Sequence, residues 1–105
     1  MTTIERTLVK SPPELWELVD DPELMARWSA ELFGAGDVDV VEREPESRLA
    51  WQSNGFARVE LDLAETGWGT NVEIRVDGPA DGAAQILEDL LDELASPQKR
   101  PFTRT

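Results

Sequence analysis

Five segments of the chain alternate between apolar and polar residues, which is the period of a strand that buries one face. They are Thr3–Val9, Val38–Arg43, Arg48–Gln52, Phe56–Leu63 and Trp68–Val76. The alternation is clean in the last two segments, and it predicts a sheet with one face toward the core and the other toward water. In the last strand we expect Trp68 and Thr70 to point inward.

Helical spacing marks three further segments, beginning with two short ones. Ser11 stands three residues before Glu14 in a capping-box pattern, and two prolines occupy the first turn, where their missing N–H groups cost nothing. This helix should end near Asp20, because the next residue precedes a proline. Asp21 can cap a second helix that begins at Pro22 and is stopped by the glycines at its end.

A long amphipathic helix is predicted over Ala80–Ala95, with a row of acidic side chains opposite its apolar stripe. The stripe consists of Ala83, Leu87, Leu90, Leu91 and Leu94. Between the third and fourth strands, Asn54 and Gly55 predict a hairpin turn. We therefore predict one domain over residues 1–96, followed by a loose tail over residues 97–105.

Composition narrows the chemistry that such a domain could perform. The 105 residues include no cysteine and no histidine, which excludes disulfides, thiolate nucleophiles, Ser-His triads and zinc sites built on those residues. No apolar run approaches the roughly 20 residues of a membrane helix. The N-terminus also lacks the apolar segment of a signal peptide, so we expect a cytoplasmic protein.

The formal net charge of −12 argues against binding to nucleic acid or to an anionic membrane surface, because both need basic residues. The acidity either steers a cationic partner or simply keeps the protein soluble. Neighbouring carboxylates such as Glu60 and Asp62 lie on predicted outer faces, where a solvated surface is expected rather than acid catalysis. The segment "DVDVVERE" lacks the ligand spacing of a calcium loop, and no metal or cofactor is predicted.

The segments "IERTLV", "SPPELWELVDDPELMARW" and "GWGTNVEIRV", together with the long last helix, resemble the START-like superfamily, which includes polyketide cyclase and dehydrase-like proteins and the pollen-allergen fold. The resemblance covers nearly the whole chain. It implies an α+β helix-grip fold, in which a curved antiparallel sheet grips the C-terminal helix. Members of that family usually have six or seven strands, whereas about five are predicted here. The cavity between sheet and helix should accordingly be smaller, or filled.

The candidate ligand-binding residues are those expected to face this cavity. Aromatic walls are typical of small-molecule sites, although each tryptophan also stands where a core residue would be. The candidates are Arg6, Trp28, Leu32, Trp51, Trp68, Thr70 and Leu87.

Arg6 is unusual among them, because it alternates with apolar residues on the expected inner side of the first strand. A buried guanidinium needs an acidic or carbonyl partner. It could bind the acid group of a ligand, form a structural salt bridge to Glu42 or Glu60, or reach water at the end of the strand.

Two functions of different classes follow. As the resemblance implies, the protein would bind a hydrophobic or amphipathic small molecule between the sheet and the C-terminal helix, without catalysis. Alternatively, it is a protein-interaction or homodimerisation module with a filled core, because a sheet with few strands leaves edges that must be paired or protected. An enzyme is the third choice, since without His, Cys or Tyr a pocket carboxylate or Arg6 would act alone. No catalytic residue is assigned.

Overall fold

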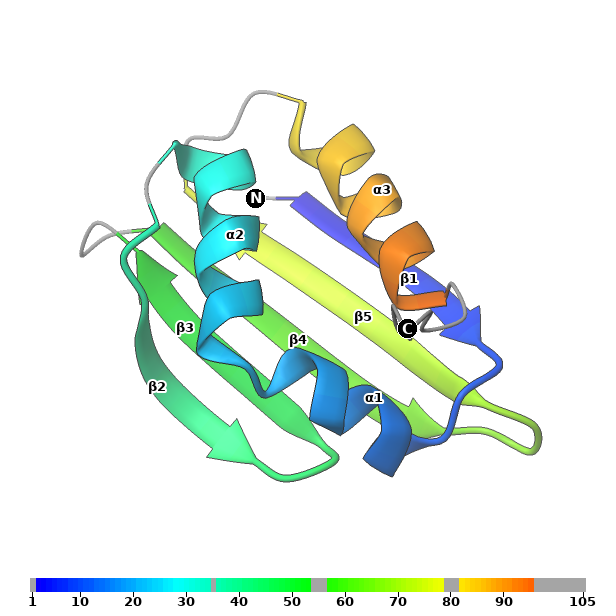
Figure 1. The fold of residues 1–105 in the computed structure, drawn as a ribbon. Coiled ribbons are helices and arrows are strands. Elements are labelled where there is room, and N and C mark those ends of the chain that lie inside the picture. The colour runs from blue at the N-terminus through cyan, green and yellow to red at the C-terminus, as the bar shows by residue number, and fades with distance from the viewer. Residues whose placement is uncertain (1, 35, 54–56, 79–81, 96–105) are drawn as a thin grey trace, which may run out of the picture.

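A computed structural model describes residues 2–34, 36–53, 57–78 and 82–95. Within these ranges the chain forms a five-stranded sheet and three helices (Figure 1). In chain order they are β1 (Thr2–Leu8), α1 (Pro12–Val19), α2 (Pro22–Phe33), β2 (Asp39–Glu44), β3 (Arg48–Ser53), β4 (Ala57–Glu65), β5 (Thr70–Asp77) and α3 (Ala83–Ala95). The predicted α+β architecture and order of elements are confirmed. The predicted Asn54–Gly55 turn and the predicted tail lie outside the described residues.

The sheet places the first two strands of the chain at opposite edges. Its strand order is β1-β5-β4-β3-β2, and every neighbouring pair is antiparallel. The chain crosses from one edge to the other through α1 and α2, and all three helices cover the same face of the sheet (Figure 1). α3 packs against β1 and α2. None of the described helices has both the length and the apolar character to cross a membrane.

The signals that start and stop the short helices act as predicted. The Ser11 side chain accepts a hydrogen bond from the Glu14 N–H, and the Glu14 side chain accepts one from the Ser11 N–H, which completes the capping box. Asp21 Oδ1 accepts a hydrogen bond of 3.0 Å from the Glu23 N–H at the start of α2. α2 ends at Gly34, whose left-handed φ of 75° suits a glycine.

The inner face of the sheet and the apolar stripe of α3 form one core. Alternate residues of β4 and β5 are buried along nearly their whole length. On α3 the buried residues are those of the predicted stripe: Ala83, Leu87, Leu90, Leu91 and Leu94. The strands, with a period of two, and the helix, with a period of 3.6, each contribute one apolar face to this core.

Trp68 corrects the predicted pattern. β5 begins at Thr70, and Trp68 lies in the turn after β4 with 65% of its surface exposed. The Thr66 N–H donates a 2.9 Å hydrogen bond to the Gly69 carbonyl, so the turn closes before the ladder begins. The alternation of apolar and polar residues extends from β5 back to Trp68. Because Trp68 precedes the first residue of the strand, its side chain is not held against the inner face of the sheet.

Candidate functional site

Four of the predicted site residues meet in the core between the sheet and the helices. The rings of Trp28 and Trp51 lie with their centroids 6.4 Å apart and an interplanar angle of 50°, and both residues are fully buried. Trp51 Nε1 donates a 2.8 Å hydrogen bond to Ser29 Oγ. Leu32 and Leu87 belong to the same apolar cluster. These side chains occupy the space in which the sequence predicted a ligand.

The indole N–H of Trp28 is the polar exception in this core. Its nitrogen is buried and has no hydrogen-bond partner among the described residues. An unpaired buried donor costs stability, so this atom marks the least satisfied point of the core. Trp28 lines neither of the two clefts described below.

Arg6 lies on the inner side of β1, as predicted, but its predicted partners are wrong. Its guanidinium pairs with Glu88 and Asp92 of α3. Glu42 is out of reach because β2 lies at the opposite edge of the sheet, and Glu60 belongs to the outer face. The hydrogen bond to Asp92 raises the pKa of Arg6. The arginine therefore holds the C-terminal helix to the edge strand.

Thr70 is buried at the start of β5 and also has a structural contact. Its hydroxyl donates a 2.6 Å hydrogen bond to the carbonyl of Lys10. This bond ties the loop after β1 to the turn before β5. Arg6, Thr70 and the exposed Trp68 thus lie apart from the buried group around Trp28.

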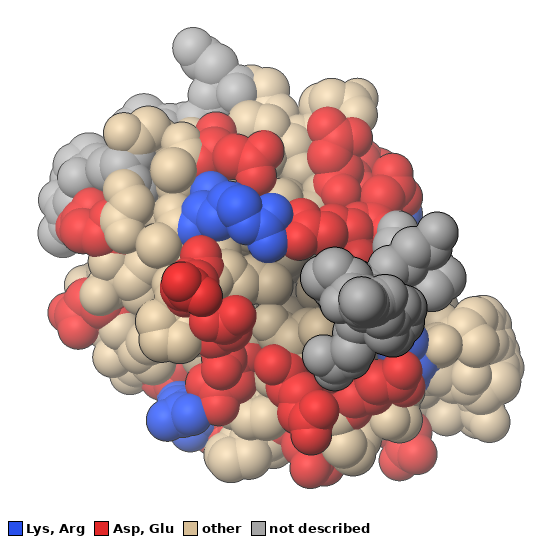
Figure 2. Space-filling model, in the orientation of Figure 1, with Lys and Arg blue, Asp and Glu red and all other residues tan. Residues whose placement is uncertain are grey.

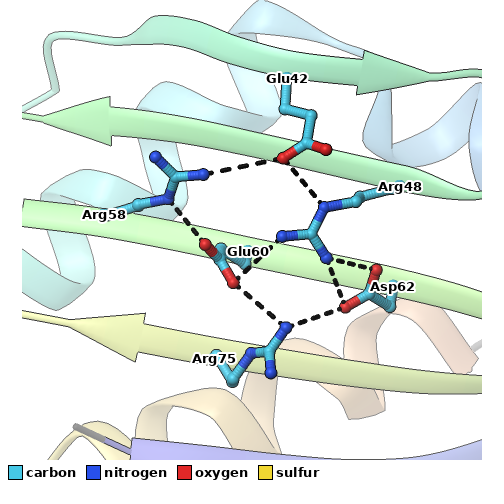
Figure 3. Close-up of polar contacts among 6 residues, drawn as sticks. All are labelled: Glu42, Arg48, Arg58, Glu60, Asp62 and Arg75. Carbon is cyan, nitrogen blue, oxygen red and sulfur yellow. Dashed lines mark hydrogen bonds and ion pairs between the residues drawn. The ribbon is translucent and has the colours of Figure 1, made fainter.

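A charged cluster on the outer face of the sheet was not foreseen from the sequence. Three arginines and three carboxylates from four adjacent strands alternate in it (Figure 3). This outer-face cluster consists of Glu42, Arg48, Arg58, Glu60, Asp62 and Arg75. The alternation of each strand predicted an outer face, but only the pairing register decides which charges become neighbours.

Arg48 and Glu60 have central positions in the outer-face cluster. Arg48 lies 2.9 Å from Glu42, 2.7 Å from Asp62 and 3.2 Å from Glu60. Burial alone would raise the pKa of Glu60, but a hydrogen bond from Arg58 and the charges of the surrounding arginines outweigh it and lower that pKa. The cluster covers the outer side of β3 so fully that Ala50 has no exposed surface.

Acid should weaken the fold through this cluster. Because the pKa of Glu60 lies below its ordinary value of 4.5, the carboxylate stabilises the folded state fully above that pH and progressively less as the pH falls below it. We expect Glu60→Gln to flatten the decline in the free energy of unfolding between about pH 6 and pH 3, as measured by urea unfolding. Glu44→Gln, at an exposed β2 position, should keep the wild-type slope. An unchanged slope in Glu60→Gln would contradict the assignment.

The helical face is acidic and contains a cleft. Figure 2 shows Asp and Glu side chains spread over this side of the molecule, with few basic ones among them. The cleft has a volume of about 320 Å³. It is lined by Glu17, Leu18, Asp21, Glu23, Leu24, Arg27, Glu93 and Leu94. Arg27 and Glu93 cross it with hydrogen bonds of 2.9 and 2.6 Å, and the bond from Arg27 lowers the pKa of Glu93.

A second cleft, of about 290 Å³, lies at the end of β1. Its walls are the loop that follows β1, the first turn of α1 with Pro12 and Glu14, and the turn between β4 and β5 together with Glu65. Val9 and Trp68 both line it, and they are 76% and 65% exposed. Among the described residues, no group of three or more acidic side chains is arranged to hold a metal ion.

Comparison with known proteins gives matches in structure only. No protein-family model matches the chain, and no curated protein matches it in sequence. The solved structures that it resembles include an AHSA1-like protein from Rhizobium etli, which is 23% identical with a TM-score of 0.67, over 99% of this chain and 91% of the other. CalU16 from Micromonospora echinospora is 26% identical with a TM-score of 0.59, over 90% and 75% of the two chains.

The Aha1 dimer from Colwellia psychrerythraea is a third similar structure, with 19% identity, a TM-score of 0.55 and coverage of 90% of this chain and 97% of the other. These similarities show that the chain has the START-like fold of AHSA1-like proteins. The fold that the sequence resemblance implied is confirmed, whereas membership of a particular family stays a prediction.

Proposed function

We propose that this protein is a non-catalytic interaction module that binds another protein chain through its surface. The observation that carries the proposal is the filled core. Trp28, Trp51 and Leu87 have no exposed surface, and they occupy the space where a START-like protein would hold a ligand. Well-packed cores leave few voids larger than a water molecule, so an internal ligand would have to displace these side chains.

Self-association is one form that such an interaction could take. The Aha1 structure from Colwellia psychrerythraea is a dimer, and this chain shares its fold. The sheet of the present protein also ends in two edge strands, β1 and β2, and edge strands favour pairing with other chains unless they are protected. Sedimentation equilibrium of the full chain measures its molar mass in solution, and so distinguishes a homodimer from a monomer that binds a different partner.

Ligand binding is the second candidate, and the cleft on the helical face favours it. Its volume of about 320 Å³ falls at the lower end of the range of small-molecule sites. Three leucines, Leu18, Leu24 and Leu94, give it an apolar surface among acidic side chains. A ligand there would be amphipathic and positively charged, and it would bind outside the core.

A titration with apolar and amphipathic small molecules tests both candidates. In Trp68→Phe the exposed indole is removed, so fluorescence reports on the remaining tryptophans, two of which are fully buried. We expect no change in that fluorescence across a broad panel, because the core has no room. Quenching with NMR shifts at Leu87 would overturn the interaction proposal in favour of an internal ligand. Shifts confined to Leu18 and Leu24 would instead support the cleft on the helical face.

A further inference from the structure

β1 is an edge strand of the described sheet. β1 pairs with β5 in continuous register along all 7 of its residues, and in the described part of the chain no strand lies on its other side. It contains no proline and no bulge, and its only charged residues are Glu5 and Arg6. A regular edge of this kind presents unpaired N–H and C=O groups to any extended chain.

The opposite edge of the sheet is protected. The register of β2 shifts between Val40 and Glu42, and four of the six residues of this strand are charged. Bulges and charged side chains are the devices that keep edge strands from pairing. The two edges of the sheet therefore differ: β2 has a bulge and four charged residues, whereas β1 is regular and its inward-pointing charge, Arg6, is paired with α3.

A cleft with both polar and apolar walls lies at the C-terminal end of β1, where Val9 and Trp68 are its large apolar side chains. Leu8 pairs with Thr70, which brings the turn containing Trp68 beside Val9. An exposed Trp beside an exposed Val contributes little to folding, whereas Trp is enriched among the residues that dominate protein interfaces. The hydroxyl oxygen of Thr66, which also lines the cleft, is buried and has no partner among the described residues.

Charge on both faces of β1 favours a basic partner. On the outer face Glu5 lies directly opposite Glu73 of β5, and like charges in this cross-strand position are unfavourable. On the inner face Arg6 stands against two carboxylates, Glu88 and Asp92. A basic side chain on an added strand would relieve the pair of glutamates, whereas a second copy of β1 would bring another Glu5 and another net charge of −12.

We propose that β1 binds an extended, basic segment of a partner protein as a sixth strand, with a bulky apolar side chain of that segment in the cleft between Val9 and Trp68. This inference rests on the interaction function proposed above and gives it a surface and a partner chemistry. Main-chain hydrogen bonds would supply affinity, and the cleft and the glutamates would supply specificity.

The probe for this surface is a synthetic nine-residue peptide of alternating valine and arginine that ends in leucine, added to the isotopically labelled full chain. We expect the amide resonances of β1 and the Trp68 indole to shift, and the β1 amides to gain protection from exchange. A matched peptide with glutamate in place of arginine should not bind. Glu5→Lys should weaken binding by about tenfold because it turns attraction of a basic strand into repulsion, and Trp68→Ala should do so because it removes the aromatic wall of the cleft.

Glu44→Lys, on the opposite edge, is the control with the same charge change and should leave the affinity within about twofold. Absence of binding, or equal affinity in the Trp68→Ala and wild-type proteins, overturns the inference. So does a peptide-free homodimer whose β1 amides are already protected. If the peptide shifts only resonances of the helical-face cleft, the β1 surface is wrong but the proposed interaction function is not contradicted. Quenching with NMR shifts at Leu87, as described above for an internal ligand, would contradict the interaction function itself.

Discussion

Replacing Trp51 with alanine is expected to lower the free energy of unfolding by about 3–5 kcal/mol, the range found when a buried aromatic side chain is truncated in a core. Trp51 is fully buried against Trp28, and its loss also leaves the Ser29 hydroxyl buried without its donor. Because domains of this size have a total stability of about 5–15 kcal/mol, the variant should be at the margin of folding. Urea unfolding followed by circular dichroism measures the loss.

Trp68→Ala is the matched control, since it removes the same side chain from a position that is 65% exposed. It should stay within about 0.5 kcal/mol of the wild type. Similar losses of unfolding free energy in both variants would show that the Trp28–Trp51 contact does not stabilise the core. A ligand bound between the sheet and the helices would then again be a candidate.

The second large effect is expected for Gly69→Ala, in the turn between β4 and β5. A Cβ atom at this position would lie 2.1 Å from the Leu8 carbonyl oxygen and 3.3 Å from the Val9 Cα, so the backbone itself would have to move. We expect a loss of about 1–3 kcal/mol, as for other overpacked sites, because the turn must separate from β1. Amide exchange at Leu8 and Thr70, which pair across the two strands, should report the separation.

Gly67→Ala provides the comparison within the same turn. A Cβ atom there meets nothing within 4 Å, and the residue has no left-handed φ, so stability should change by no more than about 0.5 kcal/mol. If Gly69→Ala unfolds at the same urea concentration as Gly67→Ala, the turn does not lie against β1. The cleft at the end of that strand, between Val9 and Trp68, would then not form either.

The interior of this protein is occupied by large buried side chains. Its fold is that of AHSA1-like proteins, and two tryptophans and a leucine stripe lie buried between the sheet and the helices. Its surface has an acidic helical face (Figure 2), an ordered charge cluster on the sheet (Figure 3) and a regular edge strand, β1. Each of these can be changed by substitution without touching the core, so fold and binding can be tested independently.

Local patterns in the sequence determined the elements and their burial. The capping box at Ser11, the stop at Gly34 and the stripe on α3 depend on residues within four positions of one another, and all three are found as predicted. The inner faces of β4 and β5 follow in the same way from a period of two. The same periodicity failed at Trp68, because it cannot show where a strand ends and a turn begins.

Only the tertiary structure decided which distant residues meet. The pairing of Arg6 with Glu88 and Asp92, the cluster around Arg48 and the filling of the core by Trp28 and Trp51 all depend on strand order and register. These relations are set by packing between segments far apart in the chain, and the local sequence carries little information about them. For the same reason the sequence could predict that a sheet with few strands has vulnerable edges, but not that β2 is bulged while β1 pairs in a continuous register.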